Sequence, residues 1–234
     1  MAMKLERIVP FGRSMDEYRK MFALADKDLD RTIIGIGDGP ASFNAEMSAL
    51  GKSVVSVDPL YVFSAAEIEE QFYAVLDNIT GQVRATPGDW VWSYHRSPEH
   101  LRENRVKVLN AFTADYENGK TQGRYVVGEL PALDFERNRF NLALCSHFLF
   151  LYSNQLSYEF HRAAVVEMLR LAPEVRIFPL LTLTLTVSPY VQPLIDELRA
   201  EGVSVSVETM DYALQRGGDK MLRIQGLDNK AGSP

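Results

Sequence analysis

The sequence predicts an α/β domain built on a mainly parallel sheet, and three observations support this prediction. Segments with helical periodicity alternate along the chain with short strand-like segments, as in α/β proteins. Residues 140–145 carry a nearly continuous apolar run, which is expected of a central strand covered on both faces. Residues 203–207 and 220–224 are expected to be strands connected through Gly217-Gly218, so the sheet should end in an antiparallel hairpin.

Length and composition limit the classes of protein to consider. With 234 residues, of which 46% are hydrophobic, the chain can bury one large core. We expect one domain over residues 1–225, followed by a loose polar tail over residues 226–234. The formal net charge of −6 makes a general nucleic-acid-binding face unlikely by composition.

Cysteine usage and hydropathy narrow the range further. Cys145 is the only cysteine, so the chain can form neither an intrachain disulfide nor a cysteine-built metal site, and we expect no bound metal. No apolar run is long enough to span a bilayer, and no signal-peptide pattern opens the chain. We therefore expect a cytoplasmic protein with no membrane partner.

The first part of the chain alternates helices and strands, each with its own boundary signal. Ser14 is placed to cap a first helix. Strands are expected at residues 32–36 and 53–57, with a short helix of helical apolar spacing between them. Ser64 and Glu67 form a capping-box pattern that opens the next helix.

The pattern changes between residues 80 and 123, which we interpret as a helical and aromatic insertion. Pro87-Gly88 is a turn signal, and Ser97 starts a charged helix. Basic and acidic residues alternate along this helix, so its arginines, Arg105 among them, are expected on a solvated, ion-paired face.

The second half returns to alternating strands and helices. Strands are expected at residues 124–127, 140–145 and 175–181. Ser157 and Ser188 are placed at the starts of the two helices that follow the later strands. The expected terminal hairpin completes a sheet of seven strands.

A glycine turn and an acid carry the strongest functional signal. Gly37 and Gly39 follow the first strand, and glycines let a backbone turn tightly against a ligand. Asp58 stands where the second strand ends, and an acid at that place can accept hydrogen bonds from a ribose diol. The pair indicates a cofactor that contains a nucleoside.

These features resemble the class I S-adenosylmethionine (SAM)-dependent methyltransferases, whose Rossmann-like sheet is doubly wound and ends in an antiparallel hairpin. The resemblance covers about residues 32–59 and 124–224. The family's glycine motif runs apolar-apolar-acid-apolar-Gly-x-Gly-x-Gly, and here it reads Ile33-Ile34-Gly35-Ile36-Gly37-Asp38-Gly39-Pro40-Ala41. Gly35 replaces the acid and Ala41 the third glycine, while Asp38 is placed to compensate for the missing acid.

The resemblance implies where the adenosine half of SAM would lie. Asp58 would bond both ribose hydroxyls, and Pro59-Leu60 would flank the adenine. Gly-Glu at residues 128–129 resembles the family's Gly-Asp pair, so Glu129 would lie near the adenine amine, with Leu130 beside it.

The methionine half would lie at the end of the strand at residues 140–145. There the resemblance places Ser146 and His147 beside the methionine arm and the incoming nucleophile. Together these assignments give ten cofactor-binding residues: Gly37, Asp38, Gly39, Asp58, Pro59, Leu60, Glu129, Leu130, Ser146 and His147.

The implied function is transfer of a methyl group from SAM to a small molecule. Such an enzyme mainly aligns the nucleophile, and it needs a general base only when the nucleophile arrives protonated. His147 is the candidate base, with an unperturbed pKa of about 6.5. Alternatively, His147 is a neutral structural histidine satisfied by backbone at a strand end.

Aromatic residues in and after the insertion are candidates for a substrate lid. Trp90, Trp92 and Tyr94 alternate in the insertion, and Tyr152 follows the strand that carries His147. Aromatic rings can enclose a flat or cationic substrate. The alternative is that the rings of the insertion form its own small core.

Two other functions remain open at this point. An NAD(P)-dependent oxidoreductase would also use a glycine turn and an acid, although no Tyr-x-x-x-Lys pair follows and the chain ends in a hairpin. Asn141 also stands where the fourth-strand motif of the resembled family has an acid. The departures at Gly35, Ala41 and Asn141 also suit a non-catalytic SAM-binding protein with a methyltransferase fold. The sequence indicates neither the acceptor nor the oligomeric state.

Overall fold

The computed structural model describes residues 10–226, and a seven-stranded sheet forms its centre. The strands lie in the order β3-β2-β1-β4-β5-β7-β6. The first five run parallel, whereas β7 is antiparallel to both β5 and β6. The strands are β1 (Ile33–Ile36), β2 (Val54–Val57), β3 (Tyr125–Val126), β4 (Leu142–Ser146), β5 (Glu174–Phe178), β6 (Ser204–Thr209) and β7 (Lys220–Gln225). The predicted α/β class, with a mainly parallel sheet and a terminal hairpin, is confirmed.

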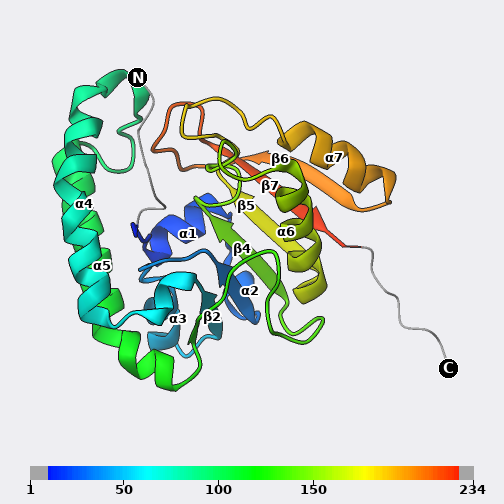
Figure 1. The fold of residues 1–234 in the computed structure, drawn as a ribbon, viewed down its shortest axis with the longest axis horizontal. Helices are drawn as coiled ribbons and strands as arrows, with labels where there is room; N and C mark the ends of the chain where they lie inside the picture. The colour runs from blue at the N-terminus through cyan, green and yellow to red at the C-terminus, as the bar shows by residue number, and fades with distance from the viewer. Residues whose placement is uncertain (1–9, 227–234) are drawn as a thin grey trace.

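Helices cover both faces of the sheet (Figure 1). The α-helices are α1 (Met15–Met21), α2 (Asp26–Leu29), α3 (Phe43–Ala49), α4 (Ala65–Ala85), α5 (Pro98–Thr121), α6 (Tyr158–Leu171) and α7 (Val191–Ala200), and two short 3₁₀ helices are η1 (Pro59–Val62) and η2 (Pro87–Asp89). The predicted caps Ser14, Ser64, Ser97 and Ser157 each accept a hydrogen bond from the first turn of their helix.

Alternation along β4 explains why the sheet needs a helix layer on each side. Leu142 and Leu144 pack with α1 and α3, while Ala143 and Cys145 face the core formed with α6 and α7. The buried apolar run that predicted a central strand therefore feeds two separate cores. This is the doubly wound arrangement expected from the sequence.

The long helices α4 and α5 pack against each other along the β3 edge of the sheet (Figure 1). The helix α4 continues to Ala85, so the change of pattern at residue 80 falls inside it rather than at its end. Trp90, Trp92 and Tyr94 lie in the connection between the two helices, where the described part shows an isolated bridge from Trp90 to Gln215. Gly226 donates to the carbonyl of Pro173. The rest of the expected tail lies outside the described residues.

Candidate functional site

A cavity of about 680 Å³ opens where the parallel strands β1, β2 and β4 end. The carboxyl ends of parallel strands are the usual ligand-binding edge of such sheets. All ten residues that the sequence assigned to the cofactor line this cavity: Gly37, Asp38, Gly39, Asp58, Pro59, Leu60, Glu129, Leu130, Ser146 and His147. They come from the ends of four strands, β1, β2, β3 and β4, and the loops that follow them.

The glycine turn has the backbone conformation that its residues allow. Gly37 has a φ of +69° and Gly39 a φ of +53°, in the left-handed region that favours glycine. A Cβ atom on Gly37 would also stand 3.1 Å from the ring of Phe148. The turn is therefore both tight and open to the cavity, so a ligand can approach its backbone.

The absence of a side chain at Gly35 leaves the space that the Asp38 side chain occupies. A Cβ atom at Gly35 would lie 1.9 Å from one carboxylate oxygen of Asp38. The Asp38 side chain therefore folds back into the space that a side chain at position 35 would fill. The acid missing from the motif is replaced in space by an acid three residues later.

The Asp38 carboxylate is held by the protein itself. The hydroxyl of Tyr18 donates to one oxygen at 2.5 Å, and the hydroxyl of Ser56 donates to the other at 2.6 Å. Burial raises the pKa of Asp38 to about 6 in spite of these two bonds. Both hydroxyls steady the carboxylate at the base of the turn.

Asp58 keeps hydrogen-bonding capacity for a ligand. Its two oxygens each accept one backbone N–H, from Gly39 and Leu60, both at 2.8 Å. Each oxygen of a carboxylate can accept two bonds, so one lone pair on each remains for a diol. Burial raises the pKa of Asp58 to about 6. Tyr61 donates to the carbonyl of Gly39 at 2.7 Å and fixes the turn against this acid.

The loop after β3 supplies the opposite wall. Leu130 is buried, whereas the side chain of Glu129 is exposed at the rim of the cavity. A Cβ atom on Gly128 would lie 2.9 Å from Val57, so this loop packs closely against the end of β2.

The surroundings of His147 fit both roles predicted for it, a general base and a neutral structural histidine. Its backbone N–H donates to the carbonyl of Phe178 at 2.7 Å, and Ser146 Oγ lies 3.0 Å from its Nδ1. No described residue bonds its Nε2, although the ring lines the cavity. Burial, followed by the positive charges of Arg13 and Arg105, holds the pKa of His147 well below its usual range. The imidazole is therefore neutral at physiological pH.

Arg13 also lines the cavity, and sequence reasoning missed it. Its segment crosses the glycine turn, because Ser42 N–H donates to the Arg13 carbonyl at 3.1 Å and a Cβ atom on Gly12 would overlap the carbonyl of Pro40. Arg13 donates to the carbonyl of Phe11, but its buried Nε has no partner among the described residues. No motif marks this residue, because its position depends on how the chain before α1 folds back.

A second missed feature is a buried ionic cluster beside the cavity. Arg105 donates to both carboxylate oxygens of Glu17 at 2.8 Å, and the Tyr212 hydroxyl donates to the same carboxylate at 2.8 Å. His95 Nε2 lies 3.2 Å from Glu17. The expectation that Arg105 belongs to a solvated face was wrong, since 1% of its side chain is exposed. A helical charge pattern cannot show which turn faces a neighbouring element.

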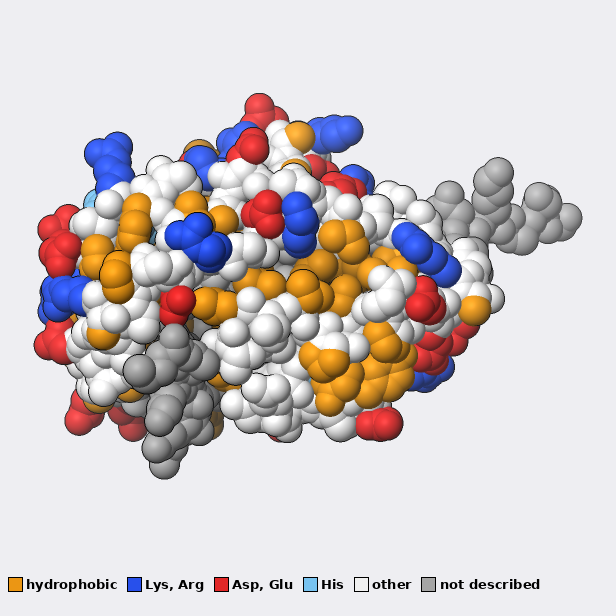
Figure 2. Space-filling view, turned by 90° about the horizontal axis from the view of Figure 1, so that it is seen from above, with side chains coloured by type: hydrophobic (Ala, Val, Ile, Leu, Met, Phe, Trp, Pro, Cys, Tyr) orange, Lys and Arg blue, Asp and Glu red, His pale blue; other side chains and the backbone are white. Residues whose placement is uncertain are grey.

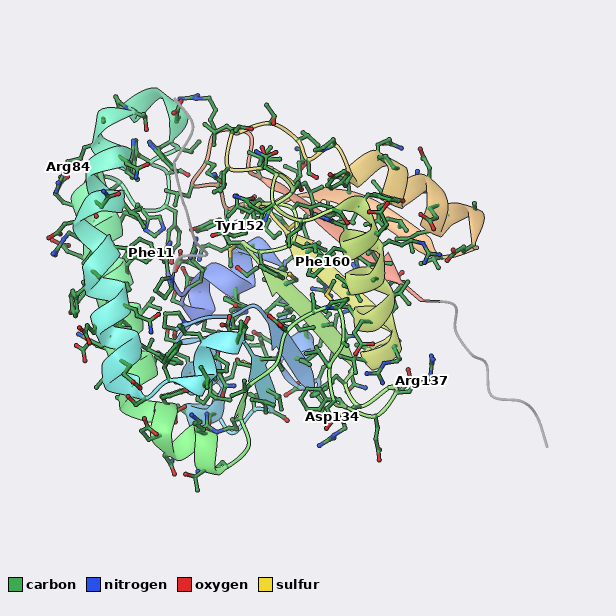
Figure 3. All side chains as sticks on the ribbon, viewed as in Figure 1. Phe11, Arg84, Asp134, Arg137, Tyr152 and Phe160 are labelled. Atoms are coloured by element: carbon green, nitrogen blue, oxygen red, sulfur yellow. The ribbon has the colours of Figure 1, made fainter. Side chains whose placement is uncertain are left out.

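The lid candidates divide into two groups. Trp90 and Tyr152 line the cavity, whereas Trp92 and Tyr94 are not among its lining residues. Trp90 packs in a small cluster from the insertion, so it contributes both to a local core and to the cavity wall. Figure 3 places Phe11 beside the α4–α5 pair, Phe160 on α6 and Tyr152 between them.

The part of the chain that the structure describes holds neither a candidate metal site nor a candidate membrane span. Within residues 10–226, no three His, Cys, Asp or Glu side chains are grouped so that they could hold a metal ion. No helix in the same stretch is both long enough and apolar enough to cross a membrane.

A known protein is similar to nearly the whole chain. The chain is 31% identical over 224 residues to the uncharacterised protein MJ0045 of Methanocaldococcus jannaschii, covering 95% of this chain and 98% of that protein. No protein-family model matches the sequence.

Solved structures with similar folds include SAM-dependent methyltransferases. Magnesium protoporphyrin IX methyltransferase of Synechocystis PCC 6803, with bound SAM, gives a TM-score of 0.47 at 13% identity, covering 91% of this chain and 77% of that chain. A TehB-like SAM-dependent methyltransferase of Corynebacterium glutamicum gives a TM-score of 0.45 at 13% identity, covering 90% and 86%. These similarities are too distant to carry an argument about activity.

Proposed function

We propose that this chain transfers a methyl group from SAM to a small molecule. The chain belongs to the same family as the protein MJ0045 and has the fold of class I SAM-dependent methyltransferases. One observation carries the proposal. The ten residues assigned to the cofactor from sequence, although spread over 111 positions (147 minus 37, plus one), line a single cavity.

The residues of this cavity fit the adenosine half of SAM. Asp58 would accept the two ribose hydroxyls on its remaining lone pairs. Leu60 and Leu130 offer apolar contacts for the adenine, and Glu129 at the rim can accept from its amine.

Other residues of the cavity fit the methionine half of SAM. The guanidinium of Arg13 would bind the methionine carboxylate, because it is charged, lines the cavity and has an Nε without a partner among the described residues. Burial and the neighbouring Arg105 lower the pKa of Arg13 to about 10, which still leaves it charged at neutral pH. Gly37 lets the cofactor lie close to the backbone.

The chain would contribute alignment and a proton acceptor to the reaction. Bound SAM supplies a methyl group that is already activated on a sulfonium. Holding a nucleophile in line with that group can be worth about 7–11 kcal/mol. The neutral ring of His147, with its free Nε2, would take the proton from a hydroxyl nucleophile as the new bond forms.

Isothermal titration calorimetry (ITC) tests this function against the oxidoreductase alternative. S-adenosylhomocysteine (SAH), SAM and NADH are titrated separately into the full chain. We expect SAH and SAM to bind at one site per chain and NADH to give no saturable heat. Binding of NADH without binding of SAH or SAM would contradict the proposal.

A further inference from the structure

We infer that the acceptor is an uncharged, largely apolar small molecule with a ring system, bound in an apolar arm of the cavity. This inference rests on the proposed function, since it names the substrate class for the same site. We define the apolar arm by its lining residues from the N-terminal segment, α4, the α4–α5 connection, α5 and the β6–β7 connection: Phe11, Ile79, Val83, Trp90, Leu101 and Leu214.

The apolar arm is built by the elements that sequence reasoning had treated as an insertion. Ile79 and Val83 lie one turn apart on α4, and Leu101 comes from the facing helix α5. With Trp90 they form one hydrophobic cluster, against which Leu214 packs. These residues also line the cavity, so the cluster is the wall of a binding space as well as a local core.

Trp90 turns an apolar face to this space. Its indole N–H donates to the hydroxyl of Thr86 at 3.0 Å, so the polar atom of the ring already has a partner within the protein. The rings of Phe11 and of Phe72 on α4 contact each other at 5.2 Å, centroid to centroid, with their planes tilted by 44°. Aromatic walls whose polar atoms are satisfied favour flat apolar ligands.

A second apolar wall faces the cavity from the loops after β4 and β5 and from the first turn of α6. Its members are Phe148, Leu151, Tyr152, Leu156, Phe160 and Leu183. On the face that Figure 2 shows, hydrophobic side chains also gather in a band, with charged side chains mostly outside it.

The charges that line the cavity leave no counter-charge for a charged acceptor in the apolar arm. Asp38, Asp58 and Arg13 lie at the cofactor end, and Glu129 is at the rim. Arg105, one turn from Leu101, is neutralised by its two bonds to Glu17.

The cavity is even less suited to a nucleic acid than to a charged small molecule. Polyanions are bound by clusters of Lys and Arg, and the formal net charge of this chain is −6.

One neutral polar side chain can also contact the acceptor. The side chain of Gln215 lines the cavity, so its carboxamide can orient a carbonyl or hydroxyl of the ligand.

The volume of the cavity is consistent with binding of the cofactor and the acceptor at the same time. Binding cavities for drug-sized molecules range over about 300–1,000 Å³. The observed 680 Å³ spans both the cofactor end and the apolar arm. The space left beside the cofactor suits a compact molecule of a few rings.

The test uses N-phenyl-1-naphthylamine, a neutral aromatic probe whose emission rises in apolar sites. The chain has two tryptophans, so the variant Trp92→Phe leaves Trp90, in the apolar arm, as the sole tryptophan. The probe is titrated into this variant saturated with SAH. We expect saturable quenching of Trp90 emission at one site per chain, without release of SAH.

Two matched variants locate the probe. Leu214→Asp puts a charge into the apolar arm at a partly exposed position, and Val187→Asp puts the same charge at an exposed position outside the cavity lining. We expect Leu214→Asp to weaken probe binding about tenfold or more, because the bound apolar probe would remove the aspartate from water without offering it a partner. Val187→Asp should leave it unchanged. SAH titration of both variants shows whether each is folded.

Three results would overturn the inference: no saturable quenching, displacement of the probe by SAH, or equal probe affinity in the two aspartate variants. Tighter quenching by a single-stranded RNA 12-mer than by the probe would also overturn it. Failure of the proposed function is distinguishable, since it appears as absence of SAH binding to the wild-type chain whatever the probe does.

Discussion

At the scale of single residues, the backbone of Gly35 and the carboxylate of Asp38 pack directly against each other, so a substitution at either position should disturb this contact. Gly35→Ala should destabilise the protein by about 1–3 kcal/mol, because its methyl group would displace a buried carboxylate. Urea unfolding measures the change. Gly81→Ala is the control, since no atom lies within 4 Å of its Cβ and alanine favours the helix α4 by about 1 kcal/mol.

A double variant identifies the cause of the Gly35 effect. If the collision with Asp38 is responsible, adding Asp38→Ala to Gly35→Ala should cost less than Asp38→Ala costs in the wild type. Additive costs would show that the two residues do not depend on each other.

Asp58 should dominate recognition of the ribose. Asp58→Asn keeps the shape of the side chain but removes its charge, so SAH binding should weaken by about 1.5–3 kcal/mol, or roughly 10- to 150-fold. ITC measures the affinity. Asp134→Asn is the charge-matched control, because Asp134 is exposed and is not among the residues that line the cavity. Figure 3 labels it on the loop after β3. Equal SAH affinities of the two variants would show that Asp58 does not bind the ribose.

The pH dependence of binding follows from the same carboxylate. Burial raises the pKa of Asp58 to about 6, and the ribose hydroxyls donate to its ionised form. SAH affinity should therefore be full above about pH 7 and fall as the pH drops through 6, to about a tenth of its plateau at pH 5. Asp38 also titrates near pH 6, so Asp58→Asn is measured in parallel. An unchanged pH profile in that variant would assign the titration to another group.

At the scale of elements, a buried ion pair connects α1 to α5 beside the cavity. Glu17→Gln should cost about 3–5 kcal/mol at pH 7, because Arg105 would be left charged and buried. Adding Arg105→Met should recover much of this loss. Asp77→Asn, which removes the exposed partner of Arg102, should change the free energy of unfolding by less than about 1 kcal/mol.

The direction of its pKa shift distinguishes Glu17 from the carboxylates of the cavity, whose pKa values are raised. The charge of Arg105 helps to hold the pKa of Glu17 well below its usual range, even though burial opposes the shift. The contribution of Glu17 to stability is therefore present above about pH 4.5 and is lost as the pH falls through its folded-state pKa. The difference between wild type and Glu17→Gln should shrink in acid, and a constant difference would contradict the assignment.

The elements were predictable where the signal lay within one segment. The apolar run of β4, the Ser64–Glu67 capping box and the hairpin strands each carry their own pattern, and each formed as expected. The buried state of Arg105 was not predictable in the same way, because it depends on Glu17, 88 positions away. Local periodicity contains no information about such a pairing.

At the scale of the whole molecule, the same distinction applies to the cavity. The resemblance placed the glycine turn and Asp58 together, since strand order brings their loops to one edge of the sheet. It did not reveal Arg13 or the apolar arm, because these come from the chain before α1, the α4–α5 pair and the β6–β7 connection, which the sheet pattern does not position. The cofactor end was therefore predictable and the acceptor end was not.

The central claim is that this cavity is a SAM site, and a crystal structure of the full chain grown with SAH tests it most directly. We predict SAH in the cavity, with its ribose hydroxyls on Asp58, its adenine beside Leu60 and Leu130, and its carboxylate on Arg13. SAH bound elsewhere, or a cavity that stays without SAH at saturating concentration, would contradict the account.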